Sequence, residues 1–267
     1  VGREKTRRLA ALQKMSLVRC AVDSEANIAE LGAAAVEAGV TIGVLVETDI
    51  GMGRCGVPPG EPTVALARKV HSTKGLRLDG LQGYEGHLVL NPEKGERAAK
   101  TREAMALLTA TRKAVRDAGL PCGIVSGGGT GTYDITGAIE GMDEIQAGSY
   151  ALMDARYKTV RPEFRNALFL LATVISARPG LAVCDVGLKG IASEFGLPLL
   201  ADHAEAKALY LAEEHAPFQG VSARVGDRLR LVPSHGCTTC NLHRRRWVVR
   251  AGRIEAVWPI EASGCLE

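Results

Sequence analysis

Two residues with metal-binding side chains stand close together near the C-terminus of the chain. His235 and Cys237 lie in residues 233–242, which read Pro-Ser-His-Gly-Cys-Thr-Thr-Cys-Asn-Leu. We expect a strand here, in which residues two apart point to the same side. An imidazole and a thiolate on one side suit a divalent transition metal such as zinc or manganese. The spacing therefore predicts a metal site at His235 and Cys237.

A nearby cysteine leaves other interpretations of this segment open. Cys237 and Cys240 have the Cys-x-x-Cys spacing of a redox pair or of half a zinc knuckle. The segment could also be purely structural. No second Cys-x-x-Cys follows, and the sequence gives no evident helix start here. Metal binding is therefore the favoured interpretation.

A glycine-rich segment further upstream predicts an anion site. Residues 126–132 read Ser-Gly-Gly-Gly-Thr-Gly-Thr. Glycine is tolerated where the backbone turns sharply or approaches a ligand closely, and free N–H groups with the Thr130 and Thr132 hydroxyls could surround a phosphate. The alternative is a flexible loop after a strand. Neither the Walker nor the dinucleotide glycine pattern is present, which argues against those nucleotides.

Two arginine-bearing segments could bind acidic groups. Arg54 lies on a glycine-flanked turn, where it could reach a ring oxygen or a carboxylate, or form a surface salt bridge. The cluster Arg244, Arg245 and Arg246 is typical of a solvated face, and a clamp for a substrate carboxylate is the alternative.

The first part of the chain alternates helices and strands, which predicts parallel strands in an α/β fold. Expected helices are residues 3–15, 24–38, 61–72 and 92–118, and expected strands are residues 17–22, 41–47, 76–81, 123–125 and 144–147. The segments with candidate chemistry follow strands, at the carboxyl ends where α/β proteins place their sites. An eight-stranded barrel needs three more strands, which we expect before Val1.

After Tyr150 the pattern changes to short β-rich runs separated by glycine and proline. The expected strands are residues 168–177, 181–186, 207–213, 227–232, 246–250 and 253–258. We therefore expect a first domain over residues 1–150, part of a (β/α)8 barrel, and an antiparallel β domain over residues 151–267.

Composition narrows the class of protein. A net charge of +3 gives no reason to expect nucleic acid as a partner, and no run of about 18 apolar residues would span a membrane. The seven cysteines have no disulfide-scaffold spacing, so we expect reduced thiols in a cytoplasm. The chain begins at Val1 rather than Met, which is consistent with an N-terminal truncation.

Several segments together resemble one family. Residues 49–57, 81–87, 126–132, 146–150 and 233–242 are similar, in the same order, to blocks of the fold-type III pyridoxal-phosphate enzymes, the alanine racemase-like group. Within that group they resemble D-serine dehydratase, D-threonine aldolase and the 3-hydroxy-D-aspartate lyases. The resemblance covers nearly the whole chain. It implies a barrel that binds pyridoxal phosphate, a C-terminal β domain that carries a metal, and a homodimer.

The resemblance also assigns roles to individual residues. It implies that the phosphate is held by Gly129, Thr130, Gly148 and Ser149, and the phenolic oxygen of the ring by Arg54. Tyr84 or Gln82 would contact the ring or the substrate. His235 and Cys237 would hold the metal, which touches the β-hydroxyl of a small D-3-hydroxy amino acid. Gln146 stands where racemases have the arginine that faces the pyridine nitrogen.

One family feature does not occur in this sequence. The family's lysine, which forms a Schiff base with the cofactor and abstracts the α-proton, lies in a segment of the type Pro-His-x-Lys-x-His-Lys on the first barrel strand. Lys5 and Lys14 lie on an expected surface helix, and no other lysine stands on a suitable strand. We therefore expect this chain alone to be inactive.

The resemblance leaves the reaction open between two lyases. Cys237 stands where the aldolase branch tends to have aspartate, which favours elimination of water from D-serine or D-threo-3-hydroxyaspartate over retro-aldol cleavage. A non-catalytic paralogue that binds phosphate and metal is the alternative class. A racemase is a weaker third possibility, because a metal has no evident role in racemisation.

Overall fold

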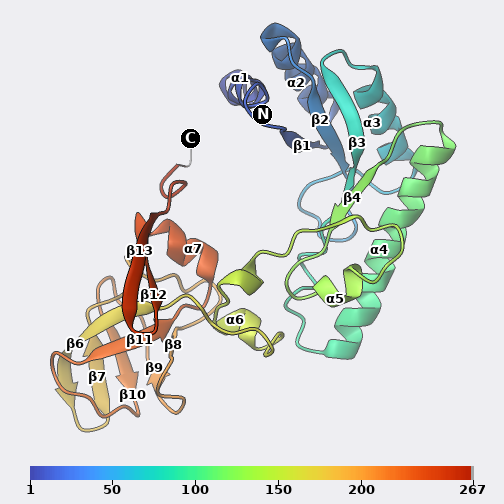
Figure 1. Ribbon diagram of the computed structural model, residues 1–267. Coiled ribbons are helices and arrows are strands. Elements are labelled where there is room, and N and C mark those ends of the chain that lie inside the picture. Colours follow the sequence, from blue (N-terminus) through green and yellow to red (C-terminus); the bar gives the residue numbers. More distant parts are fainter. Residues whose placement is uncertain (266–267) are drawn as a thin grey trace. The chain divides into compact units, whose positions relative to one another are not determined.

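The computed structural model describes residues 1–265 and forms two compact units, Val1–Ala147 and Gly148–Glu267 (Figure 1). Each unit is described here by itself. The sequence-based division lay between residues 150 and 151. Among the described residues, no helix has both the length and the apolar character needed to cross a bilayer.

Unit 1 is built on a parallel sheet of five strands in the order β1-β2-β3-β4-β5. The strands are β1 (Arg19–Val22), β2 (Ile42–Glu47), β3 (Leu76–Gln82), β4 (Ile124–Gly127) and β5 (Glu144–Ile145). The helices are α1 (Arg3–Leu12), α2 (Glu25–Ala38), α3 (Glu61–Ser72), α4 (Lys94–Asp117) and α5 (Tyr133–Thr136). Strand order follows chain order, as in a barrel wall, which confirms the predicted fold class.

Local sequence explains where these elements begin and end. The side chain of Ser24 accepts a hydrogen bond from the backbone N–H of Asn27 and so caps α2. Gly39 ends that helix in the left-handed conformation, at φ 69°. All six residues of β2 are buried, as expected for a parallel strand that is covered on both faces.

Unit 2 is an antiparallel β domain, as predicted. A six-stranded sheet has the order β8-β11-β6-β7-β10-β9. Its strands are β6 (Leu170–Arg178), β7 (Leu181–Cys184), β8 (Leu199–Leu200), β9 (Lys207–Ala208), β10 (Ala216–Gln219) and β11 (Arg228–Val232). The sequence analysis missed β8 and β10, which are short and lack a clear alternating pattern.

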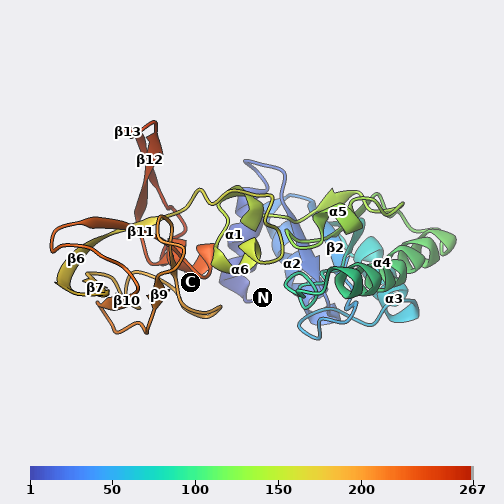
Figure 2. The ribbon, with the colours of Figure 1, turned by 90° about the horizontal axis from the view of Figure 1, so that it is seen from below.

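A separate hairpin pairs β12 (Arg245–Arg250) with β13 (Arg253–Pro259), and Figure 2 shows it projecting from the six-stranded sheet. Its turn has positive φ at both central residues, 47° at Ala251 and 75° at Gly252, as in the turns that match strand twist. The remaining helices are α6 (Ala155–Lys158), α7 (Gly236–Asn241) and the short 3₁₀ helix η1 (Ser149–Ala151).

The expected strand at His235 and Cys237 is wrong. Strand β11 ends at Val232, His235 is the extended residue before α7, and Cys237 lies inside that helix. The helix start is stabilised by Asp154, whose carboxylate accepts a hydrogen bond from the backbone N–H of Gly236. Because Asp154 lies 82 residues upstream, a local reading of the segment could not reveal this cap.

Candidate cofactor and metal sites

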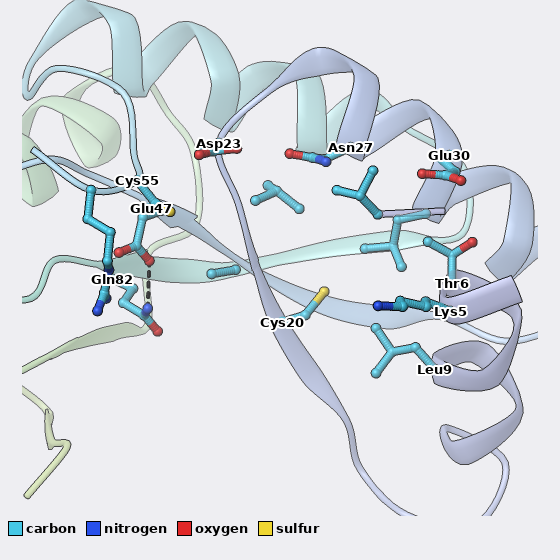
Figure 3. Close-up of a pocket in the computed structure, with 15 residues that line it drawn as sticks. Lys5, Thr6, Leu9, Cys20, Asp23, Asn27, Glu30, Glu47, Cys55 and Gln82 are labelled. Carbon is cyan, nitrogen blue, oxygen red and sulfur yellow. Dashed lines mark hydrogen bonds between the residues drawn. The ribbon is translucent and has the colours of Figure 1, made fainter. Parts of the chain in front are cut away.

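A cavity of about 550 Å³ lies in unit 1 beside the carboxyl ends of β2 and β3 (Figure 3). Glu47, Arg54, Cys55 and Gln82 line it at that end. Lys5 also lines it, and this residue is exposed on α1, the surface helix that the sequence analysis expected. A cavity of this size suits a small cofactor, and the polar groups at one end could orient it.

A row of polar side chains crosses the carboxyl ends of four strands. Glu47, Gln82, Ser126 and Glu144 are paired in register from β2 to β5. The amide of Gln82 donates to Glu47 at 2.5 Å, and the Ser126 hydroxyl donates to Glu144 at 2.6 Å. The Gln146 amide donates to Ser126 at 2.9 Å. Register neighbours in a parallel sheet share a face, so the row forms one polar layer.

Burial raises the pKa of Glu47, while the hydrogen bond from Gln82 and the charge of Arg54 oppose this shift. Sequence analysis missed Glu47 as a site residue. The sequence does point to it, because Glu47 is the only charged residue of the strand Ile42–Glu47 and stands at its end.

Arg54 is presented on a turn that an aspartate stabilises. The carboxylate of Asp49 accepts hydrogen bonds from the backbone N–H groups of Gly51 and Gly53, each at 3.0 Å. These bonds lower the pKa of Asp49. The guanidinium of Arg54 lies 5.7 Å from the centre of the Tyr84 ring. Two of the predicted cofactor residues are therefore neighbours.

The glycine run is required by close packing. A Cβ at Gly131 would lie 1.7 Å from the backbone oxygen of Val89, and one at Gly129 would lie 2.9 Å from the Tyr84 hydroxyl. Gly128 has a φ of 76°, which side chains of L-residues rarely adopt. Gly129 thus packs against Tyr84, beside Arg54. These glycines are buried, and they allow the loop to pack closely against Val89 and Tyr84.

A buried glutamate holds the glycine-rich loop in place. Glu85 is fully buried and accepts hydrogen bonds from the Gly128 N–H and from the Thr132 and Thr136 hydroxyls. The Gly129 N–H donates to Thr132. The loop is therefore fixed by internal bonds. Thr132, which we expected to help bind an anion, uses its hydroxyl proton inside the protein, and the Thr130 side chain is buried as well.

The remaining predicted phosphate residues belong to unit 2. Gly148 is exposed and precedes η1, and Ser149 begins that helix with a half-buried side chain. The backbone oxygen of Ser149 accepts a hydrogen bond from the Met153 N–H at 2.7 Å. The predicted cofactor residues are thus divided between the two units.

His235 and Cys237 interact directly in unit 2. A hydrogen bond with the Cys237 thiol raises the pKa of His235 to about 9, and the nearby carboxylate of Glu194 adds to the effect. The same hydrogen bond with His235 lowers the pKa of Cys237. A thiol that ionises easily beside an imidazole is a donor pair suited to zinc or a similar metal.

Glu194 and Phe195 contact the His235 imidazole, one at the edge of the ring and the other on its face. The Nδ1 atom of His235 lies 2.5 Å from the Glu194 carboxylate, and the Phe195 ring stacks on the imidazole at a centroid distance of 4.5 Å. Within residues 1–265, no group of three or more histidine, cysteine, aspartate or glutamate side chains could together hold a metal ion. Sequence reasoning missed Glu194, because 41 residues separate it from His235.

Cys240 differs from Cys237 in its surroundings. Burial raises the pKa of the Cys240 thiol, whereas that of Cys237 is lowered. A helix does begin before these cysteines, contrary to the sequence-based view, which removes one argument against a redox pair. The raised pKa of the Cys240 thiol remains an argument against it.

The arginine cluster lies at the start of the projecting hairpin. Arg245 and Arg246 lie over the rings of Trp247 and Trp258, at 5.5 and 6.0 Å from the ring centres. Arg244 and Arg245 also line a hollow of about 680 Å³.

Two family models match the chain. "Alanine racemase, N-terminal domain" matches residues 4–155, and "Putative serine dehydratase domain" matches residues 167–249. The 3-hydroxy-D-aspartate aldolase of Paracoccus denitrificans (strain Pd 1222) is 38% identical over 96% of this chain and 70% of its own length. The D-threonine aldolase of an Arthrobacter species is 36% identical over 99% of this chain and 72% of its own length.

A dehydratase is also similar. The D-threo-3-hydroxyaspartate dehydratase of Delftia sp. (strain HT23) is 28% identical over 82% of this chain and 65% of its own length. Among solved structures, D-threonine aldolase from Filomicrobium marinum matches with a TM-score of 0.97 and 36% identity, over 100% of this chain and 76% of that one. The Delftia dehydratase matches with a TM-score of 0.84 and 24% identity, over 97% of this chain and 76% of that one, which shows the shared fold.

Proposed function

The chain belongs to the alanine racemase-like family of pyridoxal-phosphate enzymes, and from this membership we propose that it serves a metal-dependent lyase that acts on D-3-hydroxy amino acids. The observation that carries the proposal is the hydrogen bond between His235 and Cys237. The proposal is also supported by sequence identity, because the chain is more than a third identical to two aldolases of such substrates. A hydrogen-bonded thiol and imidazole are the donor set that a metal acting on a β-hydroxyl needs.

The residues of unit 1 fit pyridoxal phosphate. The cavity is large enough for the pyridine ring, and Arg54 and Gln82 line it. Following the family resemblance, we assign Arg54 to the phenolic oxygen, Tyr84 and Gln82 to the ring or substrate, and the loop at Gly129 and Thr130 to the phosphate. The resemblance also implies a role in phosphate binding for Gly148 and Ser149, which lie in unit 2. When bound, the cofactor supplies an electron sink for the charge that develops at the substrate Cα.

The protein's own residues position and polarise the substrate. Arg54 supplies a permanent positive charge to an anionic oxygen, since arginine does not lose its proton in proteins. Gln82, fixed by its hydrogen bond to Glu47, keeps one orientation in the cavity. His235 and Cys237 would hold the metal, which would supply Lewis-acid chemistry at the β-hydroxyl.

We favour retro-aldol cleavage as the reaction. The two aldolases are 38% and 36% identical to the chain and the dehydratase 28%, and we give this difference more weight than the single residue Cys237. Cys237 nevertheless supports elimination of water as the second candidate. In retro-aldol cleavage the Cα–Cβ bond breaks and the β-hydroxyl proton leaves. In elimination, the β-hydroxyl leaves as water after the α-proton is removed.

The products distinguish the two reactions. Cleavage of D-threonine gives glycine and acetaldehyde, and elimination gives 2-oxobutanoate and ammonia. With 3-hydroxy-D-aspartate the corresponding products are glycine with glyoxylate, or oxaloacetate with ammonia. We expect glycine and an aldehyde product, in reactions that need added metal. Oxo acid and ammonia as the main products would refute cleavage, and no lyase reaction with any D-3-hydroxy amino acid would refute the proposed class.

The assay should include the cofactor lysine. It is run on the 267-residue chain and on a longer version that carries the family's lysine strand at its N-terminus. We expect activity in the longer version and none in the shorter, because both reactions need the lysine that forms the Schiff base with the cofactor.

We also propose that the substrate carries a second carboxylate. Arg244 and Arg245 line one hollow, and a charge-assisted hydrogen bond to a carboxylate is worth about 1.5–3 kcal/mol. The longer version should then have a higher kcat/KM for 3-hydroxy-D-aspartate than for D-threonine or D-serine. If kcat/KM is equal for these substrates and is unchanged by Arg244→Ala and Arg245→Ala, the arginine cluster is a solvated face and does not bind the substrate.

A further inference from the structure

We infer that Glu194 is a positioning residue for the metal site: its carboxylate accepts the Nδ1 proton of His235 and so directs the Nε2 atom to the metal. The inference rests on the proposed function, because it takes His235 and Cys237 as the metal ligands. Glu194 lies 41 residues from His235, so the sequence spacing that identified His235 and Cys237 did not include it.

Glu194 and its neighbour fix the imidazole from two directions. The Glu194 Oε1 atom lies 2.5 Å from Nδ1 at the edge of the ring. The Phe195 ring stacks on its face, with 27° between the ring planes. The hydroxyl of Thr238 donates to the same Glu194 oxygen, which limits rotation of the carboxylate. One edge and one face of the imidazole are thus occupied.

The contact determines which ring nitrogen is available. An ionised carboxylate can only accept hydrogen bonds, so the proton of a neutral His235 lies on Nδ1. The lone pair is then on Nε2, the atom that can bind a cation. Carboxylates that hold the second nitrogen of a metal-binding histidine in this way orient the ring and strengthen the ligand.

Buried hydrogen bonds hold the Glu194 segment against the His235 segment. The backbone N–H of Ala192 donates to the Thr239 hydroxyl at 3.2 Å, and the backbone oxygen of Ala192 accepts from the Ser234 hydroxyl at 3.0 Å. All three residues are buried. The two segments are therefore bonded to each other on both sides of His235, and Glu194 is held at a fixed distance from the ring.

Glu194 does not act as a third ligand in this arrangement. In the part of the chain that the structure describes, no three histidine, cysteine, aspartate or glutamate side chains converge as a metal site. The Oε1 atom of Glu194 contacts both the His235 ring and the Thr238 hydroxyl. His235 and Cys237 would therefore hold the metal, and Glu194 would act on it through the His235 ring.

Metal affinity tests the inference without using activity. Zinc binding by the wild-type protein, Glu194→Ala and Glu194→Gln is measured by competition with a chromophoric chelator. We expect Glu194→Ala to bind about 10–100 times more weakly. Glu194→Gln keeps an oxygen that can accept the Nδ1 proton, so it should recover part of the loss. Glu214→Ala removes a carboxylate paired only with exposed Lys189 and serves as the matched control.

Cobalt(II) spectra then show whether the ligands persist. At saturating cobalt, Glu194→Ala should keep the thiolate charge-transfer band, because Cys237 still binds. Circular dichroism checks folding, and Glu194→Gln carries the test if Glu194→Ala unfolds. Wild-type affinity in Glu194→Ala, or a Glu194→Gln variant as weak as Glu194→Ala, would overturn the inference. A wild-type protein that binds neither metal would instead refute the metal site in the proposed function.

Discussion

At the scale of single residues, His235 and Cys237 should be required for metal binding and Cys240 should not. Each of His235→Ala and Cys237→Ala removes one of two donors, so each purified variant should lose its zinc or manganese. Cys240→Ala should retain it, since burial keeps that thiol protonated. Metal content by mass spectrometry is the measurement, and normal content in both of the first two variants would end the metal hypothesis.

A second prediction concerns the lysines. Borohydride reduction of the 267-residue chain with pyridoxal phosphate, followed by peptide mapping, should label no lysine stoichiometrically. Lys5 is the residue to watch because it lines the cavity, but it lies on a helix rather than on a barrel strand. Stoichiometric labelling of Lys5 would show that the chain carries its own cofactor lysine.

Glu85 should be a major determinant of stability. Glu85→Ala leaves three buried donors unsatisfied, at about 1–3 kcal/mol each, so the free energy of unfolding should fall by roughly 3 kcal/mol or more. Thr136→Val removes one of the three bonds and should cost about 1 kcal/mol. Urea denaturation compares them. An equal loss in the two variants would mean that Glu85 does not organise the loop.

Sequence alone identified the residues whose chemistry is evident from type and spacing. Arg54 and the glycine run at Gly129 were predicted from sequence patterns and Tyr84 from the family resemblance, and the structure makes them neighbours. Glu85 and Glu194 escaped because their partners lie more than 40 residues away in the sequence. A carboxylate that supports a site through long-range hydrogen bonds has no local pattern to reveal it.

At the scale of elements, one aspartate joins two strands across a third. Asp79 on β3 bonds to Arg77 on its own strand and to Arg19 on β1. It passes over β2 at Gly43, where a Cβ would lie 2.3 Å from the Asp79 carboxylate. Glycine at position 43 of β2 allows the neighbouring strands β1 and β3 to share the Asp79 carboxylate.

This arrangement predicts a pH dependence of stability. Hydrogen bonds from Arg77 and then Arg19 lower the pKa of Asp79, so its contribution is present above the unfolded pKa of about 3.9 and is lost as pH falls through the folded value. Because both arginines are partly exposed, Asp79→Asn should cost only about 0.5–1.5 kcal/mol at neutral pH. The difference from wild type should vanish in acid.

Denaturation from pH 3 to 7 tests this, with Asp117→Asn as the control. Asp117 pairs with Lys113 on the exposed surface of α4, so its replacement should have little effect at any pH. A pH-independent cost of Asp79→Asn would assign its role to packing rather than charge.

Elements with a strong periodic pattern could be predicted from the sequence, and short ones could not. The limits of α3 agree with the prediction, and Ser24 and Gly39 bound α2 as expected. The helix α7 was missed because six residues starting with glycine give little helical signal. Its start depends on the distant Asp154, which only the folded chain supplies.

At the scale of the whole molecule, each unit has its own hydrophobic core. One buried cluster extends from Ala10 to Val125 and the other from Ala172 to Leu231, with no shared residues. Leu231→Ala should destabilise unit 2 by about 2–5 kcal/mol, since the residue is fully buried. Hydrogen exchange of the β6 and β11 amides should accelerate accordingly. Unchanged exchange at these amides would contradict the assignment of Leu231 to this core.

The edge of the parallel sheet has a further consequence. In the described part of the chain, β1 pairs with β2 along one side, and two of its four residues are exposed. The other side of the strand therefore presents backbone N–H and C=O groups with no ladder partner, a template for adding another polypeptide. An edge of this kind is a place where a strand from another polypeptide can extend the sheet by backbone hydrogen bonds.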